Sequence, residues 1–151
     1  MIQLHPALTF ENQARPALDF YRQALGGETD YVTYGDWAES GDASAVGVVN
    51  DHNRDFLVSG ALRTDNGDRI TAADSLEPLA GPRAGHAISL VGTPEQLRYL
   101  KHAYDKLSEG ATEVTGFDIA SWAPDEYFGT LTDRFGVHWE FGVVPQGRYL
   151  V

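Results

Sequence analysis

The chain of 151 residues contains no cysteine. Without thiols it can form neither a disulfide bond nor a zinc site built from cysteine thiolates. The usual mark of a small, disulfide-rich secreted scaffold is therefore missing. No stretch approaches the ~20 apolar residues of a membrane-spanning helix, and the first residues lack the basic and then apolar pattern of a signal peptide. We expect a cytoplasmic protein.

Basic residues are also scarce. The chain has 11 Lys and Arg against 22 Asp and Glu, which gives a formal net charge of −11 at pH 7. A protein this acidic is repelled by phosphate backbones and by anionic bilayers, so we expect neither nucleic acid nor a membrane surface as a partner. The same charge is typical of a well-solvated surface, and beyond that it only mildly favours a cationic ligand.

Two catalytic signatures are missing as well. The chain has no GxSxG motif to supply an activated serine nucleophile. Its glycines at positions 26, 27, 110 and 136 are helix stops and turn signals, and none belongs to a phosphate-cradling loop.

What the chain does contain is one pattern that occurs twice. The segment His86–Gly110 predicts an apolar strand, then a capping box at Thr93-Pro94-Glu95-Gln96, then a helix that a glycine ends. Residues 5–27 give strand, cap at Asn12, helix and glycine stop in the same order. The two copies predict a repeated module with a period of about eighty residues.

The remaining pattern completes each module with three further strands. Alternating apolar residues and turn signals predict the following strands: 2–11, 28–35, 56–63 and 69–73 in the first copy, and one led by His86, 112–119, 127–132 and 137–144 in the second. Between 36 and 53 the chain is irregular, and Val46, Val48 and Val49 form either a short strand or part of a lid.

The predicted order is therefore βαβββ, linker, βαβββ. We expect a single α+β domain, with module one at 2–75, a Pro- and Gly-rich linker at 76–85 and module two at 86–144. One such module cannot cover both faces of its sheet. Two tandem modules can form a curved half-barrel sheet, with the helices on the outside and a cleft inside.

Three segments resemble a known family: ALDFYRQALGGE at 17–28, the strand led by His86, and TDRFGVHWEFG at 132–142. They are similar to the vicinal oxygen chelate superfamily, which includes glyoxalase I, extradiol dioxygenases, fosfomycin-inactivating transferases and bleomycin-resistance proteins. The run from Trp122 to Trp139 is most similar to its PhnB-like branch. The resemblance implies the half-barrel fold and a homodimer, but it does not fix the chemistry, because the superfamily hosts unrelated reactions.

The resemblance also implies a set of metal ligands. Carried over position by position, they fall on His5, His86 and Glu140, whereas the fourth falls on Thr71, which is a poor ligand. Asp74 is near this position, but strand alternation directs it to the opposite face. Two imidazoles and a carboxylate suit Fe, Mn, Ni, Co or Zn, and such a metal would bind two adjacent substrate oxygens as a Lewis acid.

Each of these residues also has an ordinary structural interpretation. His5 is then a surface histidine, His86 a core histidine bonded to a backbone carbonyl, and Glu140 the partner of an arginine. Members of the PhnB-like branch often lack part of the metal set. Both interpretations stay open at this point.

Aromatic residues in or beside loops form a second group of candidates. Trp37, Trp122, Tyr127 and Phe128 are expected to rim a pocket for a planar or apolar ligand, or else to pack at the edges of the sheets. His138 shares a strand face with Glu140 and is a candidate for substrate binding or, more weakly, for a general base.

Two hypotheses follow. The first is a lyase, isomerase or dioxygenase that uses a divalent metal to act on a small substrate with vicinal oxygens. The second is a metal-free protein that binds or sequesters a small molecule, in the manner of bleomycin-resistance proteins.

Overall fold

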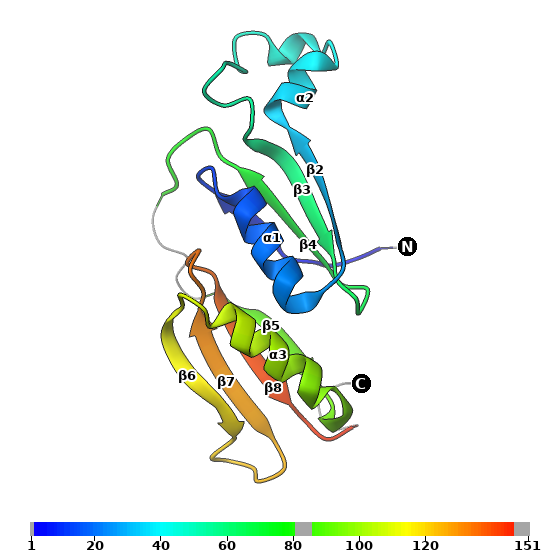
Figure 1. Cartoon of the computed structure of the whole chain (residues 1–151), viewed down its shortest axis with the longest axis vertical. Coiled ribbons are helices and arrows are strands. Elements are labelled where there is room, and N and C mark those ends of the chain that lie inside the picture. Colours follow the sequence, from blue (N-terminus) through cyan, green and yellow to red (C-terminus); the bar gives the residue numbers. More distant parts are fainter. Residues whose placement is uncertain (1, 81–85, 147–151) are drawn as a thin grey trace. The chain divides into compact units, whose positions relative to one another are not determined.

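The computed structural model describes residues 2–80 and 86–146 (Figure 1). The chain divides into two compact units, Met1–Ala80 and Gly81–Val151, which we call the first and second modules. Of the predicted linker at 76–85, residues 76–80 are loop, and the others lie outside the described residues. Within the described part, no helix is both long enough and apolar enough to cross a bilayer.

The first module contains one four-stranded sheet in the order β1-β4-β3-β2, with β1 parallel to β4. Its elements are β1 (Ala7–Phe10), α1 (Ala14–Leu25), β2 (Glu28–Thr33), α2 (Tyr34–Glu39), the 3-10 helix η1 (Ala43–Ala45), β3 (Leu57–Arg63) and β4 (Arg69–Asp74).

The second module repeats this topology in the order β5-β8-β7-β6, with β5 parallel to β8. Its elements are β5 (Ile88–Gly92), the 3-10 helix η2 (Pro94–Gln96), α3 (Leu97–Leu107), β6 (Thr112–Ile119), β7 (Tyr127–Thr132) and β8 (His138–Val143). The predicted α+β class and the two tandem βαβββ modules are confirmed. Each sheet is open, and their union into one half-barrel stays a prediction.

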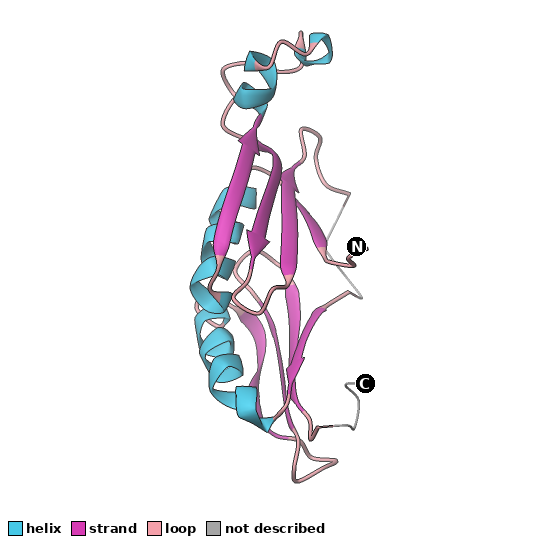
Figure 2. Cartoon of the chain, turned by 90° about the vertical axis from the view of Figure 1, so that its right-hand side faces the viewer, coloured by secondary structure: helices cyan, strands magenta, loops and turns pink. Residues whose placement is uncertain are grey.

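Each long helix covers one face of its own sheet and leaves the other face without a helix (Figure 2). The predicted apolar stripe of α1 is buried: Ala14, Ala17, Leu18, Tyr21 and Leu25. In the second module Tyr104 of α3 packs on Phe141 of β8, with ring centroids 5.4 Å apart. The open face of each sheet is therefore the place where functional side chains can stand.

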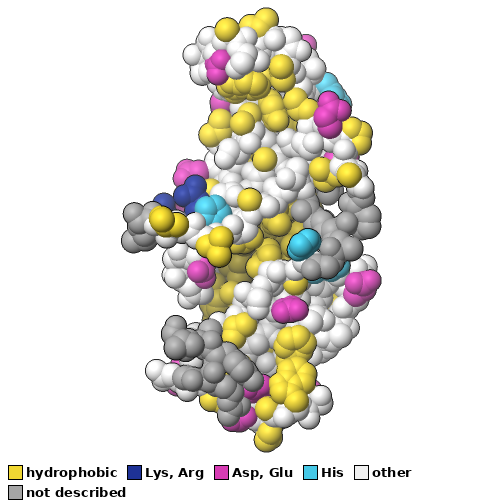
Figure 3. All heavy atoms as spheres, turned by 180° about the vertical axis from the view of Figure 1, so that it is seen from behind, with side chains coloured by type: hydrophobic (Ala, Val, Ile, Leu, Met, Phe, Trp, Pro, Cys, Tyr) yellow, Lys and Arg dark blue, Asp and Glu magenta, His cyan; other side chains and the backbone are white. Residues whose placement is uncertain are grey.

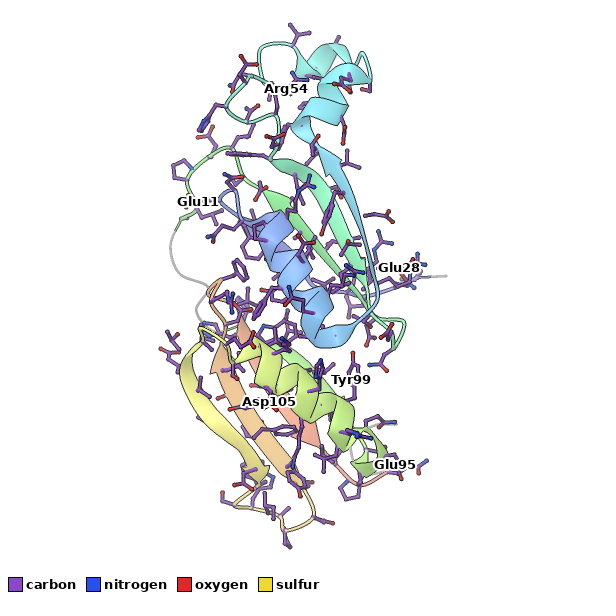
Figure 4. The ribbon with its side chains drawn as sticks, viewed as in Figure 1. Glu11, Glu28, Arg54, Glu95, Tyr99 and Asp105 are labelled. Carbon is purple, nitrogen blue, oxygen red and sulfur yellow. The ribbon has the colours of Figure 1, made fainter. Side chains whose placement is uncertain are left out.

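The two long helices begin in different ways. Before α3 the predicted capping box is present, with the Thr93 N–H donating to Gln96 Oε1 at 2.8 Å and Glu95 in the first turn (Figure 4). The predicted cap of α1 is wrong, because Asn12 adopts a left-handed conformation (φ 59°) and Gln13 occupies the cap position without a side-chain bond. The buried carboxylate of Asp74 accepts the Ala14 N–H instead, at 2.9 Å.

Two predicted strands of the first module are shorter than expected. The strand predicted at 2–11 shrinks to β1, and Ile2 and Leu4 are fully exposed. The strand predicted at 28–35 ends at Thr33, whose side chain caps α2.

Of the two alternatives for Val46, Val48 and Val49, the short strand does not form, and polar side chains bond to the backbone there in place of a ladder. Asn53 Nδ2 donates to the Val48 carbonyl at 2.9 Å, and Asn53 Oδ1 accepts the Asn50 N–H at 2.8 Å.

Candidate functional site on the open face of the second sheet

The alternation of β8 decides which side chains reach the open face. Trp139, Phe141 and Val143 are almost fully buried on the side of α3. His138 and Glu140 therefore lie on the opposite face, as their spacing predicted. Glu140 is exposed and His138 is half-buried.

Glu140 lies in a row of hydroxyl groups. Its direct neighbours across the sheet are Ser89 of β5 and Thr130 of β7. The Thr130 hydroxyl lies 3.0 Å from that of Thr115 on β6, and the Thr115 hydroxyl also accepts the Thr130 N–H at 2.9 Å. This row offers a ligand one carboxylate and several hydroxyls on a rigid strand surface.

A second row, one pair further along, contains a continuous chain of hydrogen bonds. His138 Nδ1 lies 2.6 Å from the Thr132 hydroxyl, and that hydroxyl donates to Glu113 Oε2 at 3.2 Å. The sequence indicated His138 but not its two partners. Thr132 could have been found from its alternation with Thr130. The position of Glu113 depends on the register shift between Thr112 and Thr115 in β6, which no sequence pattern indicates.

Aromatic rings stand at the far end of the same face. Phe128 pairs with Gly142 of β8, so it lies on the open side, and its ring centroid is 5.3 Å from that of Trp122. Trp122 is 63% exposed, and its indole N–H donates to the buried Glu126 at 2.8 Å. This hydrogen bond holds an otherwise exposed ring in one orientation.

The other two aromatic candidates lie elsewhere. Tyr127 pairs with Val143 on the side of α3, where the Lys101 ammonium lies 5.5 Å from its ring centroid. Trp37 belongs to α2 of the first module, and its indole N–H donates to Asp42 at 3.1 Å. Hydrogen bonds from Ser44, and then from Trp37, lower the pKa of Asp42 to about 2.

The predicted metal ligand His86 precedes β5 and is exposed, and the residue directly across from Glu140 is Ser89. Register also changes the counterpart of His5. The strands β1 and β5 have the same place in the two modules, and they end at Phe10 and Gly92. The backbone carbonyl of Phe10 accepts the N–H of Ser75, the residue after β4, and that of Gly92 accepts the N–H of Val144, the residue after β8. Counting back five residues from each end leads from Phe10 to His5, but from Gly92 to Ala87. The turn after β1 is also longer, because Glu11 and the left-handed Asn12 separate Phe10 from the cap position Gln13, whereas the cap Thr93 directly follows Gly92.

His5 has a feature of its own. Its Nδ1 atom is buried and makes no hydrogen bond. Thr71, the fourth ligand position, lies beside β1 and donates its N–H to the Pro6 carbonyl at 3.1 Å. Asp74 points to the helix side, as predicted, where it accepts the backbone N–H groups of Ala14 and Leu57.

The donor atoms of each module fit a metal only in part. Taken by itself, neither module gathers three His, Cys, Asp or Glu side chains among its described residues. The second module supplies Glu140 with hydroxyl neighbours, and the first supplies the unsatisfied nitrogen of His5. A metal held by His5, His86 and Glu140 stays a prediction.

The strands of the second sheet contribute acidic side chains but no basic ones to its open face. The four strands β5 to β8 contain no Lys or Arg, and their acidic residues Glu113, Asp118 and Glu140 pair with positions on the open face or bond to them. In the view from behind, Asp and Glu side chains appear over both modules, whereas the Lys and Arg side chains that are visible lie beside the first (Figure 3). This face therefore presents hydrogen-bond acceptors and negative charge.

No family model matches the chain. Protein YjdN of Escherichia coli K12 is 27% identical to it over 145 residues, which cover 95% of this chain and 96% of that protein. Protein PA1353 of Pseudomonas aeruginosa has a similar structure, with a TM-score of 0.74 and 25% identity over 97% of this chain and all of that one. The PhnB protein of Bacillus cereus gives a TM-score of 0.66 and 19% identity over 95% of this chain and all of that one.

More distant structures share the fold. A glyoxylase/bleomycin resistance protein/dioxygenase domain from Frankia gives a TM-score of 0.57 at 12% identity, over 99% of this chain and 96% of that one. The fosfomycin resistance protein FosX of Listeria monocytogenes, in complex with Mn(II) and sulfate, gives 0.55 at 14% identity, over 97% and 96%. The chain has the fold of the vicinal oxygen chelate superfamily, and PhnB-like proteins are among its structural neighbours.

Proposed function

We propose that this protein binds a small cationic organic molecule on the open face of the second sheet, without a metal ion. The observation that carries the proposal is the composition of that face, in which carboxylates and hydroxyls stand on strands that contain no Lys or Arg. A protonated amine is the complementary group, because it offers both a positive charge and several N–H donors.

The aromatic end of the face supports a ligand with a flat apolar part. Trp122 and Phe128 lie edge to face, and Trp122 is largely exposed while its N–H is already bonded to Glu126. An aromatic ring or a second cationic group can therefore stack on Trp122 without breaking a hydrogen bond.

A matched pair of probes tests this proposal. Tryptamine and indole-3-propionate carry the same ring, but one has an ammonium group and the other a carboxylate. We expect tryptamine alone to bind in calorimetry and to shift the NMR signals of Trp122 and of the β8 amides. Replacing Glu140→Gln should weaken binding about tenfold, the effect of losing a charge-assisted hydrogen bond. Equal binding of both probes, or shifts confined to other elements, contradicts the proposal.

A second candidate function is metal-dependent chemistry on a substrate with vicinal oxygens. The observation that favours it is the buried Nδ1 atom of His5, which has no hydrogen-bond partner and which a metal ion would satisfy. His5, Glu140 and His86 would hold the metal, which would polarise two adjacent oxygens of the substrate. The metal named with FosX gives this candidate a precedent in the fold.

Metal analysis of protein purified without chelator tests this candidate. We expect about one equivalent of a divalent transition metal, and its loss in His5→Ala but not in His52→Ala, a histidine of the loop before β3. A metal content below about a tenth of an equivalent, with no uptake of Mn, Fe, Ni, Co or Zn, rejects metal-dependent function.

A further inference from the structure

The side chains of Glu113, Thr132 and His138 form a continuous chain of hydrogen bonds, which the proposed ligand binding does not by itself explain. It crosses three adjacent strands, β6, β7 and β8, and joins a carboxylate to an imidazole through one hydroxyl. Thr132 is buried, whereas His138 is half-buried and Glu113 exposed. The middle of the chain is thus shielded from water while both ends remain accessible.

The Thr132 hydroxyl has only one proton to donate. An ionised carboxylate can only accept, so this proton points to Glu113. The Thr132 oxygen must then accept from His138, which requires the proton of the neutral imidazole to be on Nδ1. Nε2 is left with a free lone pair, on the face that also carries Glu140.

The backbone of β6 is arranged to place the Glu113 carboxylate. Thr112 and Thr115 pair with Thr132 and Thr130, so β6 contains one residue more than β7 in this interval. Such a bulge re-aims a side chain. Glu113 adopts a left-handed conformation there (φ 52°), which is uncommon for a residue other than glycine.

The next part of β6 is fixed from the helix side. The Tyr104 hydroxyl of α3 donates to the Thr115 carbonyl at 2.6 Å. The bulge therefore lies between two fixed points of β6, the pair Thr112–Thr132 and the hydrogen bond from Tyr104 to Thr115. These contacts hold Glu113 close to Thr132.

We infer that Glu113 and Thr132 are positioning residues that fix His138 in its Nδ1–H tautomer, so that Nε2 serves as the hydrogen-bond acceptor for an N–H group of the bound ligand. The inference rests on the proposed function for the identity of the ligand.

The tautomer can be measured without any ligand, by 1H–15N correlation of the His138 ring at a pH at which imidazole is neutral, roughly pH 8.5. We expect the wild-type ring to carry its proton on Nδ1. Thr132→Val, which removes the hydroxyl at nearly constant volume, should shift the ring towards the Nε2–H tautomer. Glu113→Gln should act in the same direction, because its amide can donate to Thr132 and free the hydroxyl proton for Nδ1.

Two controls separate positioning from folding. Thr132→Ser keeps the hydroxyl and should keep the Nδ1–H tautomer. Thr115→Val alters the neighbouring threonine pair on the same two strands and should leave the His138 ring unchanged. An Nε2–H tautomer in the wild type, or an unchanged tautomer in a folded Thr132→Val protein, overturns the inference.

Tryptamine binding then distinguishes this inference from the proposed function. With the tautomer established, His138→Phe and Thr132→Val should each weaken tryptamine binding about tenfold. If His138 carries its proton on Nδ1 but the protein does not bind tryptamine, the proposed function is rejected and the positioning of His138 is not. Tryptamine binding that is unaffected by both substitutions rejects the acceptor role of His138.

Discussion

Asp74 connects three elements of the first module through one buried carboxylate. Its two oxygens accept the backbone N–H groups of Ala14, at the start of α1, and of Leu57, at the start of β3, both at 2.9 Å. A negative charge at the N-terminus of a helix is also favourable for the helix dipole. Asp74 of β4 thus caps α1, since the residues directly before the helix provide no side-chain cap.

Replacing Asp74→Ala should lower the free energy of unfolding by roughly 3 kcal/mol, because two buried N–H donors lose their acceptor. Urea denaturation measures the change. Asp51→Ala, in the exposed loop before β3, is the matched control and should stay within about 0.5 kcal/mol of the wild type. Similar stability of the two variants would show that solvent replaces the Asp74 carboxylate.

At the scale of elements, the segment from α2 to η1 is held by Asp42. Its carboxylate accepts from the N–H and the hydroxyl of Ser44 at 2.9 and 2.6 Å and from the indole of Trp37 at 3.1 Å. Because the pKa of Asp42 in the folded protein lies below the ordinary aspartate value of 3.8, the bonds stabilise the segment above that value and are lost as the pH falls towards about 2.

The Trp37 indole N–H signal should therefore change with a midpoint at about pH 2. Ser44→Ala removes the largest cause of the shift and should move the midpoint up, towards 3.8. NMR titration of the indole signal measures both midpoints. A midpoint that Ser44→Ala leaves in place would assign the effect to another contact.

The edge strand β6 depends on one glycine of its neighbour. A Cβ atom at Gly129 of β7 would lie 2.7 Å from the Phe117 Cα, so the two backbones would have to separate. Phe117 joins Tyr104 and Phe141 in the aromatic cluster under α3. The close approach of β6 and β7 thus fixes the aromatic core on one face of the sheet and the hydrogen-bond chain Glu113–Thr132–His138 on the other.

Gly129→Ala should cost about 2 kcal/mol and speed hydrogen exchange of the β6 amides. It should also disturb the His138 tautomer. Gly116→Ala, where a Cβ meets nothing within 4 Å, is the matched control on β6 itself and should change neither property. Equal exchange rates in the two variants would mean that the strands adjust without loss of pairing.

At the scale of the whole molecule, each module is a four-stranded sheet with one long helix, so half of each sheet surface has no helix over it. Surfaces of this kind are usually covered by another layer. We predict a homodimer, as the resemblance to the superfamily implies. Sedimentation at micromolar concentration should give twice the mass of one chain, and the mass of a single chain would reject the dimer.

The repeat was predictable because its signals are local. The capping box at Thr93, the apolar stripe of α1 and the strand 112–119 all follow from neighbours within a few residues, and the structure confirms them. The start of α1 was not predictable, because its cap arrives from Asp74, sixty residues away in the chain. Helix α2 was missed because Tyr34 and Gly35 extend the apparent strand pattern of β2.

The sequence by itself determined the two βαβββ modules and the shared face of His138 and Glu140, since periodicity and capping are properties of short segments. Only the tertiary structure decided what stands next to these two residues. Register puts Ser89 and Thr130 beside Glu140, and the bulge in β6 brings Glu113 to Thr132 and His138. The physical reason is that a shift of one residue changes the face and partners of a strand residue, and a single extra residue in a turn or bulge causes that shift.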